Sequence, residues 1–264
     1  MMKKKVVALL LAGLMCLSVT ACGSEKGSSD SDKAKVTEKG TLVVGITDFE
    51  PMDYKDDSGE WVGFDADMAK AFGEKLGVKV EFSEIDWDNK ALELDSGSID
   101  CVWNGMTLTD EVKSAMDCSN PYCNNAQVTI VPMDKKDQYQ SVDSLKELKF
   151  AVEAGSAGEE QAKANGFEYT GVQNQASALM EVAAGTSDAA IIDSLMAAAM
   201  VGEGTSYENL TYTVKLNDEE YGVGFRKGSD LKEELNTFFK DSYADGTMQS
   251  VAEKYKVQAA LIGQ

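Results

Sequence analysis

The sequence predicts an α/β protein made of two similar lobes. Short apolar runs typical of buried strands alternate with stretches in which apolar residues recur at helical spacing. A weak internal repeat places the same helix–turn–strand pattern once in each half of the chain. With 264 residues, the chain is long enough for one large domain or two smaller ones after loss of an export segment.

The chain begins with the pattern of a secretory signal. Lysines at positions 3–5 precede an apolar run over residues 6–17, which is shorter than the roughly 20 residues that a membrane-spanning helix needs. The run leads to Val19-Thr20-Ala21-Cys22, which resembles a bacterial lipoprotein cleavage box. We expect residues 1–21 to be a signal peptide and Cys22 to become the lipidated, palmitate-bearing first residue. The alternatives are an ordinary signal peptide with a chance cysteine, or an uncleaved anchor.

Residues 22–36 are expected to form a flexible tether. They are mainly Ser, Gly, Lys and Asp, so they bury little apolar surface. No second stretch of the sequence is long and apolar enough to span a membrane. We therefore expect an extracytoplasmic protein held at the cell membrane by acyl chains, each buried methylene of which adds about 0.8 kcal/mol.

The folded part is expected to open with a strand, a helix and a second strand. Thr41–Ile46 is a short apolar run typical of a buried strand. In the following helix, residues 64–77, Asp65 is a suitable N-cap and Gly77 a suitable residue after the last turn. Residues 78–82 alternate like a strand, so the sheet is expected to be largely parallel.

The internal repeat locates a candidate site. Residues 92–100 precede the apolar Cys101-Val102-Trp103, and residues 180–188 precede the apolar run 189–192. Ligands of open α/β sheets bind beyond the carboxyl ends of strands. Asn104-Gly105-Met106-Thr107 and Asp193-Ser194 follow these two strands, so we expect both groups at a ligand site. Plain turn and capping chemistry is the alternative.

The last third of the chain returns to regular structure. Residues 221–225 are strand-like, and residues 231–245 place Leu231, Leu235 and Phe238 on one helical face. A turn at Gly246 leads into a final helix.

Composition excludes several classes of function. Without the three lysines of the export segment, 22 basic residues stand against 45 acidic ones, a net charge of −23 that repels nucleic acids. Histidine is absent, which removes the commonest general base and metal ligand. Cys101, Cys118 and Cys123 lack the spacing of a zinc site. Because three is an odd number, at least one thiol is free or pairs between chains, and a local disulfide between Cys118 and Cys123 is an open alternative. We expect neither a metal nor a cofactor.

Five segments together resemble the solute-binding proteins of polar amino-acid ABC transporters, the bacterial extracellular solute-binding proteins of family 3. The segments are residues 61–69, residues 99–109, Ser119-Asn120-Pro121-Tyr122, Tyr221-Gly222-Val223-Gly224 and Ala244-Asp245-Gly246-Thr247. The resemblance implies a type II periplasmic-binding-protein fold, in which two lobes joined by two crossing strands close on a ligand. It puts the crossings near residues 129–132 and 221–226. Lobe one is then 37–130 plus 226–264, and lobe two is 131–225.

The resemblance also implies roles for individual residues. Phe49 and Trp87 match two aromatic walls around the ligand, and the polar surroundings of Trp87 suggest that it is too exposed for the core. Asp193 matches the acid that pairs with the ligand's ammonium. The remaining expected ligand-binding residues are Asn104, Gly105, Met106, Thr107, Glu153, Ser156 and Ala157, with Gly158 in the same helix start.

One position departs from the family pattern. Family members usually carry an arginine three residues after Thr109, and that arginine clamps the ligand's α-carboxylate. Here the position is Val112, and the neighbouring Lys113 points elsewhere on a helix. Either backbone groups and hydroxyls hold the carboxylate, or the ligand lacks a standard one. Acids expected near the cleft, Glu50, Asp53, Asp86 and Glu153, favour a cationic or amine-bearing ligand.

The resulting expectation is a monomeric, non-enzymatic binding component that captures an amino acid or related amine and serves an ABC permease. A periplasmic enzyme on the same fold, resembling dehydratases of prephenate-like acids, is one alternative. Missing histidine and Val112 in place of arginine both count against it. A ligand-sensing lipoprotein is the other alternative.

Overall fold

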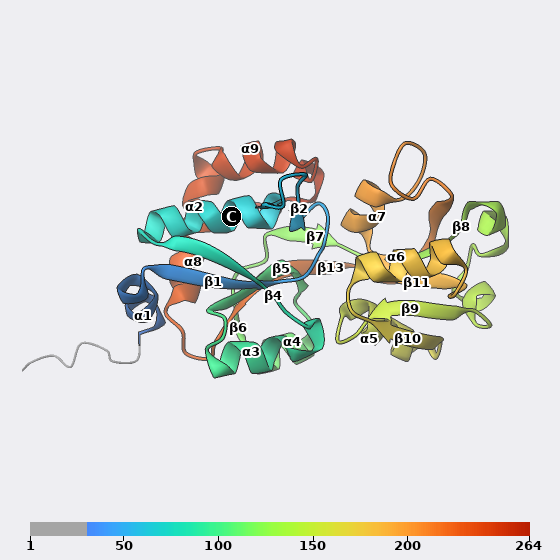
Figure 1. Ribbon diagram of the computed structural model, residues 1–264, viewed down its shortest axis with the longest axis horizontal. Helices are drawn as coiled ribbons and strands as arrows, with labels where there is room; N and C mark the ends of the chain where they lie inside the picture. The colour runs from blue at the N-terminus through green and yellow to red at the C-terminus, as the bar shows by residue number, and fades with distance from the viewer. Residues whose placement is uncertain (1–30) are drawn as a thin grey trace, which may run out of the picture.

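The computed structural model describes residues 31–264, and Figure 1 shows two α/β lobes lying side by side. The first lobe contains α1 (Asp32–Lys39), β1 (Thr41–Ile46), β2 (Tyr54–Lys55), β3 (Trp61–Val62), α2 (Phe64–Leu76), β4 (Lys79–Glu84), the 3₁₀ turn η1 (Trp87–Asn89), α3 (Lys90–Ser96), β5 (Cys101–Thr107), α4 (Asp110–Ala115), β6 (Asp117–Cys118) and β7 (Cys123–Asn125). The chain returns to it with β13 (Glu219–Phe225), α8 (Leu231–Ala244), α9 (Thr247–Lys254) and η4 (Gln258–Ala260).

The second lobe is one continuous stretch of chain. Its elements are β8 (Gln127–Pro132), η2 (Met133–Gln138), η3 (Val142–Leu145), β9 (Lys149–Glu153), α5 (Ala157–Asn165), β10 (Glu168–Val172), α6 (Gln175–Ala184), β11 (Ala189–Asp193), α7 (Ser194–Met200) and β12 (Leu210–Lys215). Within residues 31–264, none of the helices is long and apolar enough to cross a membrane.

The two sheets repeat one arrangement, which confirms the α/β fold with two similar lobes. In the first sheet, order β4-β1-β5-β13-β6, three parallel strands are followed by the antiparallel β13. In the second, order β10-β9-β11-β8-β12, three parallel strands are followed by the antiparallel β8. The repeat predicted from sequence consists of α3–β5 and α6–β11, and both helices end at a left-handed glycine, Gly97 and Gly185.

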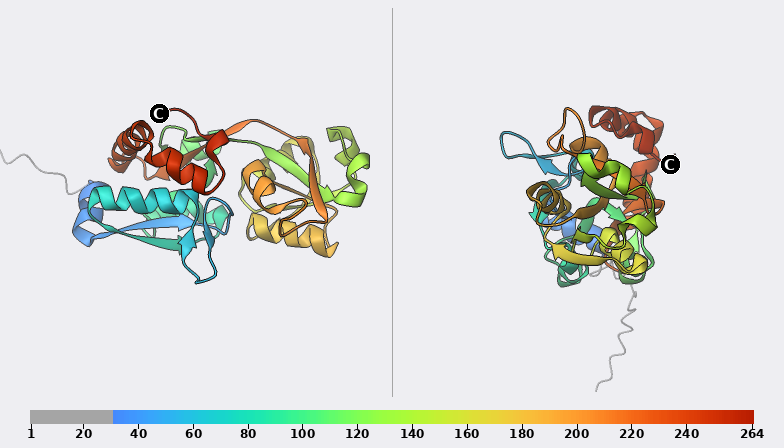
Figure 2. Two further views of the ribbon diagram at one scale, coloured as in Figure 1. Left: turned by 90° about the horizontal axis from the view of Figure 1, so that it is seen from above. Right: turned by 90° about the vertical axis from the view of Figure 1, so that its right-hand side faces the viewer.

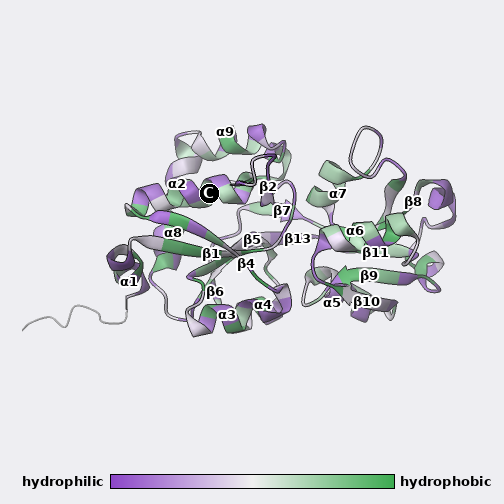
Figure 3. Cartoon of the chain, viewed as in Figure 1, coloured by the Kyte–Doolittle hydropathy of each residue, from purple (hydrophilic) through white to green (hydrophobic). Residues whose placement is uncertain are grey.

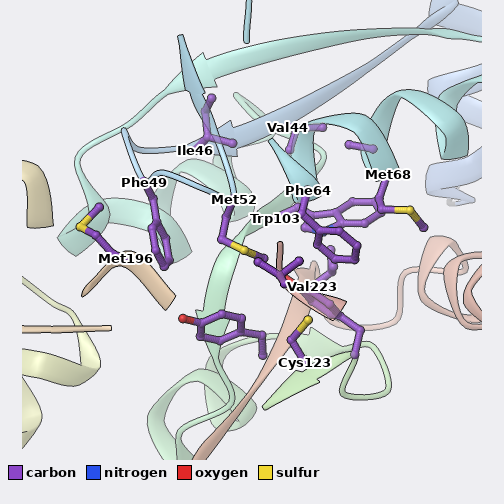
Figure 4. Packing of buried hydrophobic residues seen from close by; sticks show 14 of the residues in the cluster. Val44, Ile46, Phe49, Met52, Phe64, Met68, Trp103, Cys123, Met196 and Val223 are labelled. Atoms are coloured by element: carbon purple, nitrogen blue, oxygen red, sulfur yellow. The ribbon is translucent and has the colours of Figure 1, made fainter. Parts of the chain in front are cut away.

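Helices cover both faces of each sheet (Figure 1). Figure 3 shows hydrophobic stretches along the strands of both sheets, and the apolar residues between sheet and helices are buried. The first lobe's core joins Val44 and Ile46 of β1 to Phe64 and Met68 of α2 and to Trp103 of β5 (Figure 4). This packing fixes the position of the β1 and β5 strand ends.

The strand order moves the lobe boundaries earlier in the chain than the resemblance implied. β8 belongs wholly to the second sheet and β13 wholly to the first. The chain therefore crosses at Ala126, between β7 and β8, and at residues 216–218, between β12 and β13. The two crossings lie together (Figure 2): Leu216 N donates to Gln127 O at 2.9 Å, and Gln127 N donates to Asn217 Oδ1 at 2.6 Å.

Three further local expectations need correction. The expected tether ends early, because α1 begins at Asp32 and buries Val36 against the first lobe. Gly63, not Asp65, is the N-cap of α2. Residues 104–107 do not follow a strand but form the second half of β5. The predicted signal peptide and Cys22 lie outside the described residues.

The described cysteines Cys101, Cys118 and Cys123 are free thiols. Cys118 pairs with Gly224 of β13, and Cys123 pairs with Tyr221 of the same strand. Three strand positions correspond to about 10 Å, which is beyond the about 7 Å that a disulfide tolerates between Cα atoms. The local disulfide is therefore excluded by the sheet register.

Candidate ligand-binding site

A cavity of about 150 Å³ lies between the lobes and is lined by residues of both. It brings together all eleven residues that the sequence singled out for ligand binding: Phe49, Trp87, Asn104, Gly105, Met106, Thr107, Val112, Glu153, Ser156, Ala157 and Asp193. Gly158, Glu50, Asp53 and Asp86 are not part of the lining. The paired placement of the two repeated strands explains this convergence, because β5 and β11 both end at the cavity.

Asp193 ends β11 and is held by an array of neutral donors. Its Oδ1 accepts from Tyr221 Oη at 2.7 Å, from Gln127 Nε2 at 3.0 Å and from Asn125 Nδ2. Its Oδ2 accepts from Gln175 Nε2. Asp193 precedes α7 but makes no capping hydrogen bond, so simple helix capping does not explain this residue.

A second carboxylate lies beside Asp193. Glu219 opens β13, and its Oε1 accepts from Asn125 Nδ2 at 2.6 Å and from Gln127 Nε2 at 2.9 Å, the same two side chains that bind Asp193. Burial raises the pKa of Asp193 well above its usual value, and the charge of Glu219 raises it further. A cation at Asp193 would relieve both effects.

Glu153 is the second acid of the cavity wall contributed by the second lobe. It ends β9 and is 2% exposed. Its Oε1 has no hydrogen-bond partner among the described residues. Burial raises the pKa of Glu153 to about 8, opposed by the nearby positive charge of Lys90. A buried carboxyl oxygen without a donor is costly, so a ligand N–H group at this position would be stabilising.

The two predicted aromatic walls, Phe49 and Trp87, come from the first lobe, and both side chains are buried. Phe49 packs edge-on against Tyr221, with ring centroids 6.3 Å apart. Figure 4 shows Phe49 with Met196 of α7, a second-lobe member of the same buried cluster. Trp87 is 7% exposed and packs with Ile85 and Val112, so the expectation that it is too exposed for the core is wrong. Its sequence neighbours Asp86, Asp88 and Asn89 are exposed, whereas the Trp87 side chain is buried.

The polar groups of Asn104 and Gly105 are already engaged within the first lobe. Asn104 Nδ2 donates to Asp53 Oδ2 at 2.8 Å, and Asn104 Oδ1 accepts from Thr47 N at 3.0 Å. Gly105 N donates to Asp65 Oδ2 at 2.6 Å. A Cβ on Gly105 would lie 2.5 Å from the Phe49 ring, and its φ is +52°, so only glycine fits beneath this wall.

Asp65 is a buried carboxyl that sequence reasoning misplaced. It also accepts from Tyr122 Oη at 2.7 Å. Burial raises the pKa of Asp65 to about 7, and burial together with the charge of Asp65 raises that of Asp53 well above its usual value. The two acids hold Asn104 and Gly105 in place from behind, and neither lines the cavity.

Thr107 and Ser156 provide hydroxyls at the cavity. Thr107 Oγ1 donates to Glu219 Oε1 at 2.9 Å. Ser156 caps α5 by accepting from Glu159 N at 3.2 Å, which leaves its hydroxyl hydrogen available. Val112 is buried in the first turn of α4, where its side chain offers no charge. Within residues 31–264, no group of His, Cys, Asp and Glu is arranged to hold a metal ion.

A family model described as bacterial extracellular solute-binding proteins, family 3, matches residues 42–258. The chain belongs to this family. The arginine-binding extracellular protein ArtP of Bacillus subtilis (strain 168) is 31% identical over 261 residues, covering 96% of this chain and 98% of ArtP. Solved structures agree with the two-lobed fold. An ABC uptake transporter substrate-binding protein from Streptococcus pneumoniae with bound histidine has a TM-score of 0.77 at 29% identity and covers 86% of this chain and 97% of that chain.

An ancestral amino acid-binding protein, AncCDT-1, described as a precursor of cyclohexadienyl dehydratase, has a TM-score of 0.78 at 35% identity. The match covers 85% of this chain and 99% of that chain. All three of these relatives of the family 3 protein are named as binding proteins. The ligands named for them include arginine and histidine, so family membership defines a class of solute and leaves the individual ligand open.

The sequence did not single out every cavity residue of this family 3 protein, and Lys90 is one that it missed. Lys90 opens α3, and its Nζ donates to Trp87 O at 3.2 Å and, across the cleft, to Gly155 O at 2.8 Å. A lysine four residues before a leucine on an amphipathic helix is ordinary in sequence. Only the meeting of the two lobes shows that Lys90 lies at the site.

Proposed function

We propose that this protein is the extracytoplasmic binding component of an ABC importer and that it captures an amino acid or a related amine-bearing solute. The observation that carries the proposal is a cavity between the lobes that is lined by two buried acids of the second lobe, Asp193 and Glu153, and by the aromatic residues Phe49 and Trp87 of the first lobe. Carboxylates favour an ammonium group, and aromatic faces favour an alkyl stem or a cation. The amino-acid ligands named for relatives of this chain support the same class.

Capture by lobe closure is supported by contacts that only a closed cleft allows. A Cβ on Gly155 would lie 2.7 Å from Asp88 Cα in the opposite lobe, so the two backbones approach closely. Lys90 and Tyr221 of the first lobe bind Gly155 and Asp193 of the second. A ligand that touches both lobes shifts an open ensemble towards this closed form.

The deciding experiment is a thermal-shift screen of the twenty amino acids, L-cystine and simple amines, followed by calorimetry on each hit. We expect at least one of them to raise the melting temperature, since a ligand that binds only the native state stabilises it. Small-angle scattering should then show a smaller radius of gyration with ligand. If no member of the set binds, the proposed solute class is wrong.

We propose that the protein does no chemistry on its ligand. The site holds carboxylates and neutral amides but no histidine, since the chain contains none. AncCDT-1 is described as a precursor of cyclohexadienyl dehydratase, so the enzymatic alternative is tested directly. Incubation of the protein with each bound solute, followed by mass spectrometry, should return the solute unchanged. New product that accumulates with time would establish an enzyme instead.

We further propose that the protein is a monomer anchored through lipid on Cys22 and that it delivers solute to a membrane permease. The basic start, the apolar run and the small residues before Cys22 support the anchor. Metabolic labelling with a palmitate analogue should mark the wild type and not the Cys22→Ser variant. The variant should also be lost from the membrane fraction. Light scattering on the soluble form tests the monomer. Capture of the permease by the anchored protein separates transport from sensing.

A further inference from the structure

We propose that Lys90 binds the ligand's α-carboxylate in place of the arginine that is missing at position 112, and that the solute is therefore a zwitterionic amino acid and not a simple amine. This inference rests on the proposed function, because it assigns the ligand's second charged group at the same site.

The position of Lys90 suits this role. Lys90 lines the cavity, and its Nζ lies 5.0 Å from the centroid of the Trp87 ring. The charge of Glu111, the sequence neighbour of Val112, acts on Lys90, and Trp87 belongs to the same buried cluster as Val112. Both observations put the ammonium of Lys90 near the position where valine replaces the family's arginine. Replacement of an arginine by valine leaves this wall apolar, and Lys90 approaches the cavity from the neighbouring helix α3.

Lys90 is also available for an anion. The lining contains two basic residues of the described chain, Lys90 and Lys163. Lys163 Nζ is paired with Glu159 Oε2 at 3.2 Å, whereas Lys90 forms no ion pair within 4 Å in residues 31–264. An ammonium group has three donors, and Lys90 uses two of them on carbonyl oxygens, so one N–H remains for a ligand oxygen.

Charge balance in the cavity selects a ligand with both signs. Burial lowers the pKa of Lys90, against the negative charges of Glu153 and other acids nearby, so its charged form lacks full compensation. At the same time Glu153 Oε1 lacks a donor. A zwitterion supplies an anion to Lys90 and an ammonium to the acids. A diamine would place a second cation beside Lys90, and a diacid would place further anions beside Glu153 and Asp193.

The test compares each of the twenty standard L-amino acids with its α-carboxamide, which keeps the amine and removes the carboxylate charge. Affinities are measured by calorimetry for wild type, Lys90→Met and Lys90→Arg, with Lys113→Met as the matched control. Lys113 is exposed, is the other lysine near position 112 and does not line the cavity. For the tightest-binding amino acid, we expect wild type to prefer the acid over its amide by at least about tenfold.

Lys90→Met should lower the affinity for the acid at least about tenfold and change that for the amide by no more than about threefold. Lys90→Arg should restore most of the preference, and Lys113→Met should leave it unchanged. Because the acid-to-amide ratio is measured within one variant, a loss of stability in Lys90→Met does not obscure it. Equal binding of acid and amide by wild type would overturn the proposal, as would an equal loss of both in Lys90→Met. Binding of neither set to wild type would instead refute the proposed function itself.

Discussion

Replacing Asp193 with Asn is expected to weaken ligand binding roughly 10- to 150-fold while leaving a folded protein. A hydrogen bond to a charged group contributes about 1.5–3 kcal/mol, and every 1.4 kcal/mol is about tenfold in affinity. Asp193 is 4% exposed, so water does not screen its interaction with a ligand ammonium. Asn keeps the shape of the side chain and removes the charge that this interaction needs.

The cost to folding follows from the four donors around Asp193. An Asn oxygen in the place of Oδ1 still accepts from Tyr221, Gln127 and Asn125, and only the bond from Gln175 to Oδ2 is lost. That loss costs about 1–3 kcal/mol, partly offset because a neutral amide is no longer a charge buried beside Glu219. Asp193→Ala would leave Tyr221 Oη and Gln175 Nε2 without an acceptor, and Asn125 and Gln127 with Glu219 alone, so it would confuse a cost to folding with a cost to binding.

The assay is titration calorimetry on the best ligand from the screen, with melting temperatures recorded without ligand. Asp188→Asn is the matched control, because Asp188 is an exposed acid just before the other end of β11. The pH adds a second readout. Burial and the charge of Glu219 raise the pKa of Asp193. The wild-type affinity should therefore fall as the pH is lowered through this raised pKa, because Asp193 then loses its charge. The affinity of Asp193→Asn should lack this pH dependence. Unchanged affinity in Asp193→Asn would refute Asp193 as the ammonium partner.

Three further outcomes are expected. Burial raises the pKa of Glu153 to about 8, so the folded protein retains a proton that the unfolded chain loses near the ordinary carboxyl pKa. The wild-type protein should therefore lose stability as the pH rises from about 5 to 8. Calorimetry should show that Glu153→Gln gains stability relative to wild type across that window. Trp87→Ala should cost about 3–5 kcal/mol in denaturant unfolding as well as affinity, and a drop in affinity alone would contradict its burial in the core. Gly155→Ala should impair closure and weaken binding, because its Cβ would meet Asp88. Gly166→Ala is the control: with a similar φ of +68° and open space around it, it should strain the backbone equally without affecting affinity. Small-angle scattering with ligand should show impaired closure in Gly155→Ala and normal closure in Gly166→Ala.

Local signals predicted the elements that depend on local physics. The strand Thr41–Ile46 was expected at its observed bounds, because a continuous apolar run has no other stable place than a buried strand. Gly97 and Gly185 marked the ends of α3 and α6, since both adopt the left-handed conformation that glycine alone adopts freely. The repeat of these two units carried the prediction of the two-lobed fold and of the site between them.

Features that depend on residues far apart in the chain could not be predicted from the sequence. Asp65 has the composition and position of an N-cap, yet its carboxyl is buried because Gly105 N and Tyr122 Oη, 40 and 57 residues away, both donate to it. Trp87 stands in a polar run, and only the packing of Val112 and its neighbours shows that its ring is enclosed. Such contacts are set by tertiary packing, which no local pattern in one chain reports.

The two crossings were placed several residues late for a related reason. An apolar strand such as β8 or β13 has the same sequence pattern whether it bridges two lobes or belongs to one sheet. The two cases differ in the strand with which it pairs. The pairing puts the polar residues Asn125, Gln127 and Asn217 at the crossings instead. They were not recognised because side-chain amides in a short connection have no periodicity.

These amides give the ligand's charge a physical link to lobe closure. Asn125 and Gln127 flank the first crossing, and each donates both to Asp193 at the cavity and to Glu219 at the start of the strand after the second crossing. In this form the two carboxylates share neutral donors, and the charge of Glu219 raises the pKa of Asp193, which adds an electrostatic cost when the cavity holds no cation. A ligand ammonium at Asp193 reduces that cost only when the lobes have met, so its binding energy favours the closed form selectively. A neutral solute of the same shape would fill the cavity and leave the repulsion between Asp193 and Glu219 in place, so we expect it to bind more weakly than a solute with an ammonium group.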